Sequence, residues 1–132
     1  MKQILFVCVE NAGRSQMAEA FANQHGKGKI AASSAGVRLA DRINPIVIEA
    51  MKEKGIDIST NRPKPLTKKM AEEADQVITM GCNVEEVCPA PLIRDVLDWN
   101  LEDPKGKSMQ KVREIRDEIE RKVLALIAET KD

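Results

Sequence analysis

The sequence lacks an excess of either charge. Its 132 residues carry 21 Lys plus Arg and 21 Asp plus Glu, so the formal net charge is zero. A neutral chain has no overall electrostatic attraction for nucleic acid or for an anionic membrane, and we expect neither partner. Any anion site has to be built locally. The length fits one catalytic domain, 1–132, with a single hydrophobic core.

Long hydrophobic runs are also missing. The N-terminal apolar run from Ile4 to Cys8 is too short for the core of a signal peptide. No other stretch approaches the roughly 20 residues that a membrane-spanning helix needs. These absences predict a cytoplasmic protein.

Cysteine and histidine are scarce, with Cys8, Cys82, Cys88 and the single His25. An odd number of cysteines is a poor disulfide framework; in a reducing compartment they are more often buried residues, metal ligands or reactive thiols. The spacing of Cys82 and Cys88 is not that of a zinc site, and His25 has no ligand set nearby in the sequence. We expect no bound metal, and interpret His25 as a solvated cation near a helix end.

Short apolar runs alternate with segments of helical periodicity, which is typical of a parallel sheet with helices on both faces. Helix starts are marked by Asn44 before Pro45, by Thr67 and by Ser108. The prediction is an α/β fold with a four-stranded parallel sheet. The expected strands are 4–8, 30–33, 76–80 and 96–99; the expected helices are 15–25, a helix from Pro45 stopped by Gly55, one from Thr67 to Ala74, and one from Ser108 through Leu126.

Between the first strand and the first helix, five residues separate Cys8 from Arg14. A loop of this length can turn its backbone N–H groups inward as an anion nest, and the helix N-terminus adds its dipole. Arg14 can bind two oxygens of a tetrahedral oxyanion, and the same positive environment favours a Cys8 thiolate, to which Ser15 can donate. The pattern predicts a nucleophile in an oxyanion-binding loop rather than a buried strand-end cysteine. The loop comprises Val9, Glu10, Asn11, Ala12, Gly13, Arg14 and Ser15.

An Asp-Pro step follows the last predicted strand. Asp103 precedes Pro104, which holds it in an extended or turn conformation. If this loop covers the Cys8 site, Asp103 can donate a proton to a leaving oxygen. Asp-Pro is also a common turn, so the assignment depends on the Cys8 loop.

The two remaining cysteines are close in sequence. In a straight helix, Cys82 and Cys88 would be separated by roughly 9 Å of rise, from 1.5 Å per residue. A disulfide needs Cα atoms within about 7 Å, so bridging requires a bent or unwound segment. That suits a redox switch, and the alternative is a pair of incidental loop cysteines.

Together these segments closely resemble the thioredoxin-coupled arsenate reductases, which share the low-molecular-weight protein tyrosine phosphatase fold. The resemblance implies an arsenate reductase without a bound cofactor, with thioredoxin or a similar dithiol protein as external reductant. Phosphate and sulfate are expected as analogues of arsenate, and the chain is expected to be a monomer. The resemblance covers 8–19, 34–36, 44–45 with 49–51, 56–59, 77–88 and 99–104.

The resemblance also implies a relay of three thiols. Cys8 attacks arsenate held by the loop amides and Arg14, while Asp103 protonates the departing oxygen. Cys82 then attacks the adduct, which releases arsenite and leaves a Cys8–Cys82 disulfide. Cys88 attacks Cys82, and thioredoxin reduces the resulting Cys82–Cys88 disulfide.

Three positions depart from the family pattern. Glu10 places a carboxylate in a loop where relatives often have a neutral residue, and we expect it to point outward. Gly13 lies where many relatives have cysteine or serine. Lys64 lies in a segment that helps to bind potassium in some reductases; a lysine there could replace the cation, so we expect no potassium requirement.

The alternative function is a low-molecular-weight protein tyrosine phosphatase that hydrolyses phosphomonoesters through a cysteinyl-phosphate. It would use Cys8, Arg14 and Asp103, with water completing the cycle. The absence of tyrosine, a residue that could wall a phosphotyrosine ring, and the presence of Cys82 and Cys88 argue against it. A non-enzymatic redox or oxyanion-binding module would not need Asp103.

Overall fold

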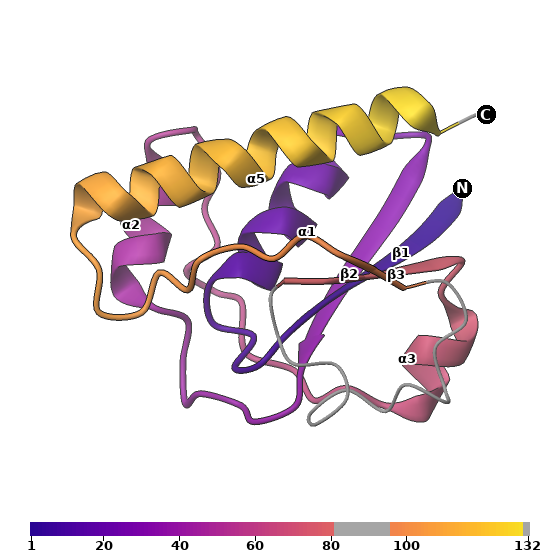
Figure 1. Ribbon diagram of the computed structural model, residues 1–132, viewed down its shortest axis with the longest axis horizontal. Helices are drawn as coiled ribbons and strands as arrows, with labels where there is room; N and C mark the ends of the chain where they lie inside the picture. Colours follow the sequence, from indigo (N-terminus) through magenta and orange to yellow (C-terminus); the bar gives the residue numbers. More distant parts are fainter. Residues whose placement is uncertain (81–95, 131–132) are drawn as a thin grey trace.

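The computed structural model describes residues 1–80 and 96–130. Four parallel strands form one sheet in the order β2-β1-β3-β4. Helices cover both faces of this sheet, and the predicted fold class is confirmed (Figure 1). The strands are β1 (Lys2–Cys8), β2 (Ile30–Gly36), β3 (Gln76–Thr79) and β4 (Val96–Asp98). The described helices are α1 (Arg14–His25), α2 (Pro45–Lys52), α3 (Lys68–Glu73) and α5 (Met109–Glu129).

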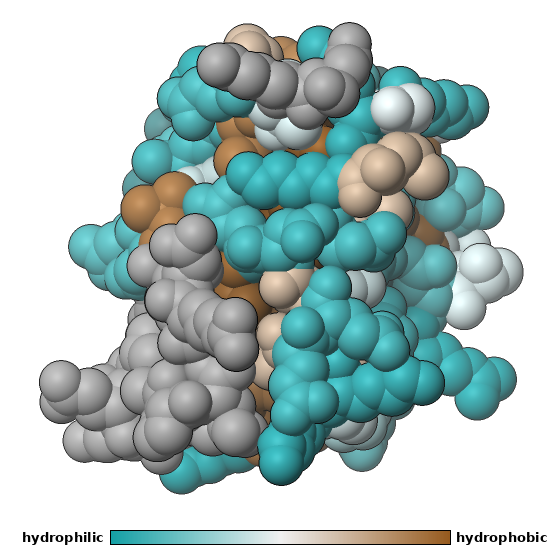
Figure 2. Space-filling view, turned by 90° about the vertical axis from the view of Figure 1, so that its right-hand side faces the viewer, coloured by the Kyte–Doolittle hydropathy of each residue, from teal (hydrophilic) through white to brown (hydrophobic). Residues whose placement is uncertain are grey.

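The central strand β1 is buried on both sides. Ile4, Phe6 and Cys8 belong to the larger hydrophobic core, together with residues of α1, α2 and α5. Leu5 and Val7 belong to a smaller core that includes α3 residues. This is why β1 reads as a continuous apolar run rather than an alternating one. Figure 2 shows mostly hydrophilic side chains on the side of the molecule that carries both termini, with apolar ones visible between them.

The predicted helix caps are present. Asn44 accepts a hydrogen bond from the Ile46 amide at 3.1 Å and begins α2. Thr67 and Ser108 accept from backbone amides in the first turns of α3 and α5, at 3.1 and 3.2 Å. These side chains satisfy amides that lack a partner within the helix. None of the described helices is both long and apolar enough to cross a bilayer.

Several element boundaries differ from the predicted ones: β1 begins at Lys2 rather than at Ile4, and α5 continues past Leu126 to Glu129. The helix α2 ends at Lys52, and Gly55, with a φ of 77°, closes the turn that follows by donating to the Lys52 carbonyl at 2.9 Å. The strand β2 continues past Ser33 to Gly36, which pairs with Cys8. A Cβ at Gly36 would lie 2.8 Å from the Val9 carbonyl oxygen. Only glycine therefore allows β2 to run alongside the chain where it leaves β1.

An ion-pair cluster joins the end of α2 to α5. Arg116 is buried and donates to the Ala50 carbonyl at 2.9 Å and to Glu53 at 2.7 Å. Arg113 also donates to Glu53, at 2.7 Å through Nη2. The hydrogen bonds from Arg113 and then Arg116 lower the pKa of Glu53 from 4.5 to about 2.

This pKa shift predicts pH-dependent stability. Because the folded-state pKa lies below the unfolded value, the contribution of Glu53 is complete above pH 4.5 and is lost as pH falls towards 2. Glu53→Gln should lower the urea midpoint at pH 7, and the difference from the wild type should shrink between pH 4.5 and pH 2. Glu49→Gln, an exposed site in the last turn of α2 just before Glu53, is the control. A midpoint difference that stays constant from pH 7 to pH 3 would contradict the role given to Glu53.

Candidate active site

The loop between β1 and α1 holds its carbonyl groups outward. The oxygens of Val9, Glu10, Ala12 and Gly13 all accept backbone hydrogen bonds, at 2.8 to 3.2 Å. Asn11 supplies the turn with a φ of 54°. Carbonyl groups fixed outward leave the amides facing the concave side, which is the geometry of an anion nest. The donors are the amides of Met17, Val37, Arg38, Ala40 and Asn44.

Cys8 lies at the floor of this loop with 2% of its surface exposed. Its Sγ accepts from the Asn11 amide at 3.2 Å and lies 2.8 Å from the Ser15 Oγ. The side-chain amide of Asn11 donates to the same Oγ at 2.7 Å. Since this contact uses a lone pair of the oxygen, the Ser15 hydroxyl hydrogen is available to the sulfur. Both contacts to the sulfur stabilise a thiolate.

Asn11 is the centre of a buried network. Its Oδ1 accepts from Gln16 Nε2 at 3.0 Å and from the Lys64 amide at 2.8 Å. Gln16 is fully buried and also donates to the Arg62 carbonyl at 3.2 Å. The 61–64 segment therefore supports the loop from behind. Gln16 was not predicted from the sequence to be part of the site. The sequence feature that could have indicated it is a polar residue in the first turn of a helix that packs against the core.

Arg14 is buried at 7% exposure and connects three segments. Its Nη1 donates to the carbonyls of Met80, just after β3, and Leu101, just after β4, the latter at 2.9 Å. Its Nη2 lies 3.8 Å from the Asp103 Oδ2. The carboxyl ends of the strands thus meet at one edge, as parallel topology predicts. These contacts hold the guanidinium in place beside the loop.

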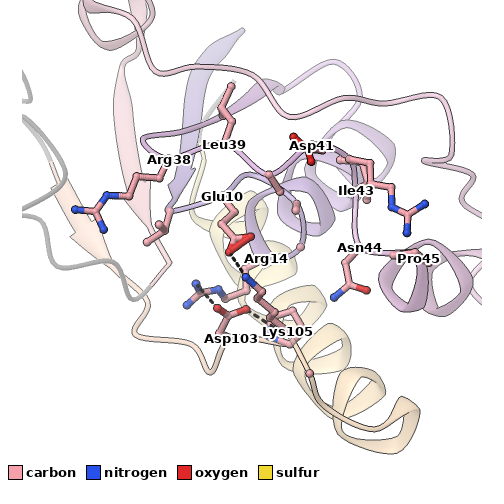
Figure 3. Close-up of a pocket in the computed structure, with 17 residues that line it drawn as sticks. Glu10, Arg14, Arg38, Leu39, Asp41, Ile43, Asn44, Pro45, Asp103 and Lys105 are labelled. Atoms are coloured by element: carbon pink, nitrogen blue, oxygen red, sulfur yellow. Dashed lines mark hydrogen bonds and ion pairs between the residues drawn. The ribbon is translucent and has the colours of Figure 1, made fainter.

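Asp103 reaches the site, as the sequence predicted it could. Its side chain is 54% exposed, and its Oδ1 accepts from the Lys105 amide at 3.0 Å. Asp103 and Arg14 line a cavity of about 770 Å³ beside the loop (Figure 3). Cys82 and Cys88 lie outside the described residues. The described chain stops at Met80, whose amide donates to the Val7 carbonyl at 2.9 Å, next to Cys8.

The expectation that Glu10 points outward has to be corrected. Glu10 lines the cavity, and its Oε1 lies 2.9 Å from the Lys105 Nζ, across the opening from the loop (Figure 3). The hydrogen bond and the charge of Glu10, with a smaller effect of Asp103, raise the pKa of Lys105. The ammonium thus balances a carboxylate that would otherwise repel an anion. Sequence reasoning missed Lys105, because the pair is separated by 95 residues.

Lys64 places an ammonium behind the loop. Its Nζ lies 3.2 Å from the Glu19 Oε1, and the Ser34 hydroxyl donates to the same oxygen at 2.9 Å. That Lys64 replaces a cation here stays a prediction. Within 1–80 and 96–130, His, Cys, Asp and Glu side chains form no group of three or more that could hold a metal ion. His25 lies at the far end of α1 from Cys8, 3.0 Å from Glu120.

The chain is similar to one known protein family, and to curated proteins, along nearly its whole length. The model of the low molecular weight phosphotyrosine protein phosphatase family matches residues 3–132. A putative arsenate reductase of Halobacterium salinarum is 41% identical over 129 residues, covering 94% of this chain and 89% of the relative. A glutaredoxin arsenate reductase of Synechocystis sp. is 42% identical over 130 residues, covering 97% and 98%.

Solved structures give the same fold with two kinds of activity. An arsenate reductase in the phosphate binding state has a TM-score of 0.88 at 40% identity, covering 99% of this chain and all of the other. A thioredoxin-dependent arsenate reductase of Corynebacterium glutamicum has 0.77 at 40%, covering 97% of this chain and 62% of the other. An arginine phosphatase of Geobacillus stearothermophilus has 0.86 at 27%, covering 97% and 92%.

The contact between Ser15 and Cys8 predicts a reactivity effect. In a Cys82→Ser/Cys88→Ser background, Ser15→Ala should slow alkylation of Cys8 by iodoacetamide at pH 7 by about tenfold, the value of one hydrogen bond to a charged group. Ser59→Ala, at an exposed site on the surface, is the control. An unchanged alkylation rate in Ser15→Ala would show that the hydroxyl does not stabilise the thiolate.

Proposed function

The chain belongs to the low molecular weight phosphotyrosine protein phosphatase family, and from this premise we propose that it is an arsenate reductase. The observation that carries the proposal is the loop geometry: a buried Cys8 sulfur lies within an anion nest beside Arg14. That arrangement binds a tetrahedral oxyanion and attacks it with a thiolate. The arsenate reductases at 41% and 42% identity support arsenate as that oxyanion.

The first step joins arsenate to Cys8. The loop amides and the Arg14 guanidinium hold three arsenate oxygens, while the Cys8 thiolate attacks arsenic and one oxygen leaves as water. Asp103, which lines the same cavity as Arg14, supplies the proton to that oxygen. The 3.8 Å approach of Arg14 to Asp103 supports this placement, since both groups then contact the same anion.

The second step reduces arsenic. Cys82 attacks the Cys8 sulfur, the sulfur–arsenic bond breaks, and its electron pair leaves with arsenic as arsenite. Cys88 then displaces Cys8 from Cys82, which regenerates the Cys8 thiolate and leaves a Cys82–Cys88 disulfide. The position of Met80 supports this order, because it stands two residues before Cys82 and is hydrogen-bonded next to Cys8.

An external dithiol closes the cycle by reducing the Cys82–Cys88 disulfide. We propose thioredoxin for this role, in a cytoplasmic setting, with the chain acting as a monomer that needs no bound cofactor or potassium. The thioredoxin-dependent reductase among the solved structures supports thioredoxin. The relative named a glutaredoxin arsenate reductase makes a glutaredoxin the alternative reductant.

Phosphomonoester hydrolysis is the second candidate. The arginine phosphatase shares the fold at 27% identity, and Cys8, Arg14 and Asp103 could also form and hydrolyse a cysteinyl-phosphate. Such a reaction needs no second or third thiol. Substitution of Cys82 or Cys88 should therefore abolish repeated arsenate reduction and leave phosphomonoester hydrolysis unchanged.

The relay predicts a turnover limit. With thioredoxin, its reductase and NADPH, the wild type should form many equivalents of arsenite, whereas Cys88→Ser should form at most about one per chain. Hydrolysis of p-nitrophenyl phosphate should be equal in both proteins and serves as the control. Multiple turnovers of Cys88→Ser would refute the relay, and no arsenite from the wild type with either thioredoxin or glutaredoxin would refute the reductase.

The acid role of Asp103 predicts a slower first step. Asp103→Asn should lower the single-turnover rate of arsenite formation by roughly 10²-fold or more, the usual contribution of a general acid. Glu102→Gln, the neighbouring exposed carboxylate, is the matched control. An Asp103→Asn rate equal to the wild type would remove Asp103 from the chemistry.

A further inference from the structure

The loop that carries Asp103 docks directly onto the oxyanion loop. Arg14 Nη1 donates to the Leu101 carbonyl at 2.9 Å, two residues before Asp103. Pro104, one residue after it, packs against Gly13 so closely that a Cβ at Gly13 would lie 2.9 Å from the Pro104 Cγ. A side chain at position 13 would therefore require the proline ring to shift away from the oxyanion loop.

A third contact comes from Lys105, whose side chain forms an ion pair with the oxyanion loop. Its Nζ lies 2.9 Å from Glu10, while its own backbone amide donates to the Asp103 Oδ1 at 3.0 Å. The same residue therefore binds the oxyanion loop with its side chain and the acid with its backbone. With Oδ1 taken, Oδ2 is the oxygen that faces Arg14.

We propose that Lys105 is a positioning residue for Asp103, and that its ion pair with Glu10 holds the acid over the oxyanion loop. The inference rests on the proposed function, because it needs Asp103 to act as the acid. In this role Lys105 acts through Asp103 and takes no part in the bond-making or bond-breaking itself. Its effect on the reaction passes through the position of the Asp103 carboxyl group.

The environment of the pair separates this role from that of an ordinary surface ion pair. Lys105 is 71% exposed, and such pairs contribute little to global stability. We expect the pair to affect the reaction rather than global stability, because Glu10 and Lys105 both line the cavity beside the oxyanion loop. The neighbouring pair of Lys107 with Glu102, at 3.5 Å, belongs to the same segment but does not line the cavity, which makes Lys107 a matched control.

The pair also predicts opposite effects on arsenate affinity for its two members. Without Lys105, the Glu10 carboxylate stands unbalanced at the cavity wall and repels an anion. Without Glu10, the Lys105 ammonium is free to attract one. Both losses should slow the chemical step, but only the loss of Lys105 should raise the arsenate concentration needed for half-saturation.

The test is a set of single-turnover measurements of arsenite formation against arsenate concentration. Lys105→Met should lower the maximal rate about fivefold, a small part of the 10²–10⁴ that a general acid supplies, and should raise the half-saturating concentration. Glu10→Gln should lower the maximal rate about as much without raising that concentration. Lys107→Met should match the wild type within about twofold, and Lys105→Arg should recover most of the lost rate.

A double-variant comparison shows whether Lys105 acts through Asp103. In an Asp103→Asn background, Lys105→Met should cause no further loss of maximal rate, because the group it positions is gone. A loss that multiplies with that of Asp103→Asn, or a Lys105→Met rate equal to the wild type, would overturn the inference. If the far-UV circular dichroism shows that Lys105→Met is unfolded, Glu10→Gln replaces it in the same comparison with Asp103→Asn.

The outcomes also separate a failure of the proposed function from a failure of the inference about Lys105. An Asp103→Asn rate equal to the wild type overturns the proposed acid and the inference with it. If Asp103→Asn lowers the rate of arsenite formation but Lys105→Met does not, the inference alone is overturned and the proposed function stands.

Discussion

The hydrogen bonds that turn the carbonyl groups of the Cys8–Ser15 loop outward are the constraint on which the rest of the site depends. If those carbonyl groups faced the concave side of the loop, the backbone amides could not point at a bound anion. The neighbouring segment between β2 and α2 supplies most of the donors, and Gly36 lets β2 approach closely enough for this. The sheet order then places Cys8 between its β2 and β3 neighbours, where the following loops meet.

Inside that frame, the polar groups around Cys8 form a connected chain. Asn11 orients Ser15, Ser15 contacts the sulfur, and Gln16 and the Lys64 amide hold Asn11. Buried polar networks are favourable only when their members are satisfied, and in the described part of the chain no buried side-chain nitrogen or oxygen lacks a partner. The Cys8 sulfur is therefore held in position without a ligand, which would reduce the reorganisation required by the proposed reaction.

Local features of the sequence predicted most of this arrangement. The Cys8–Arg14 spacing, the caps at Asn44, Thr67 and Ser108, and the buried central strand all depend on residues close together in the chain. The sequence did not predict the Glu10–Lys105 pair, because two exposed-looking charges 95 residues apart carry no pattern. It also underestimated β2, since the end of that strand is set by the close approach of Gly36 to Val9 and not by apolar periodicity.

We propose that Cys8 is the first of three sulfurs in a relay and not a hydrolytic nucleophile acting alone. Mass-spectrometric mapping of the cysteines after exposure of the reduced protein to arsenate, without any external thiol, tests it most directly. We expect one equivalent of arsenite and a Cys82–Cys88 disulfide, with Cys8 recovered as a free thiol. Arsenite formation with Cys82 and Cys88 both still reduced would contradict it.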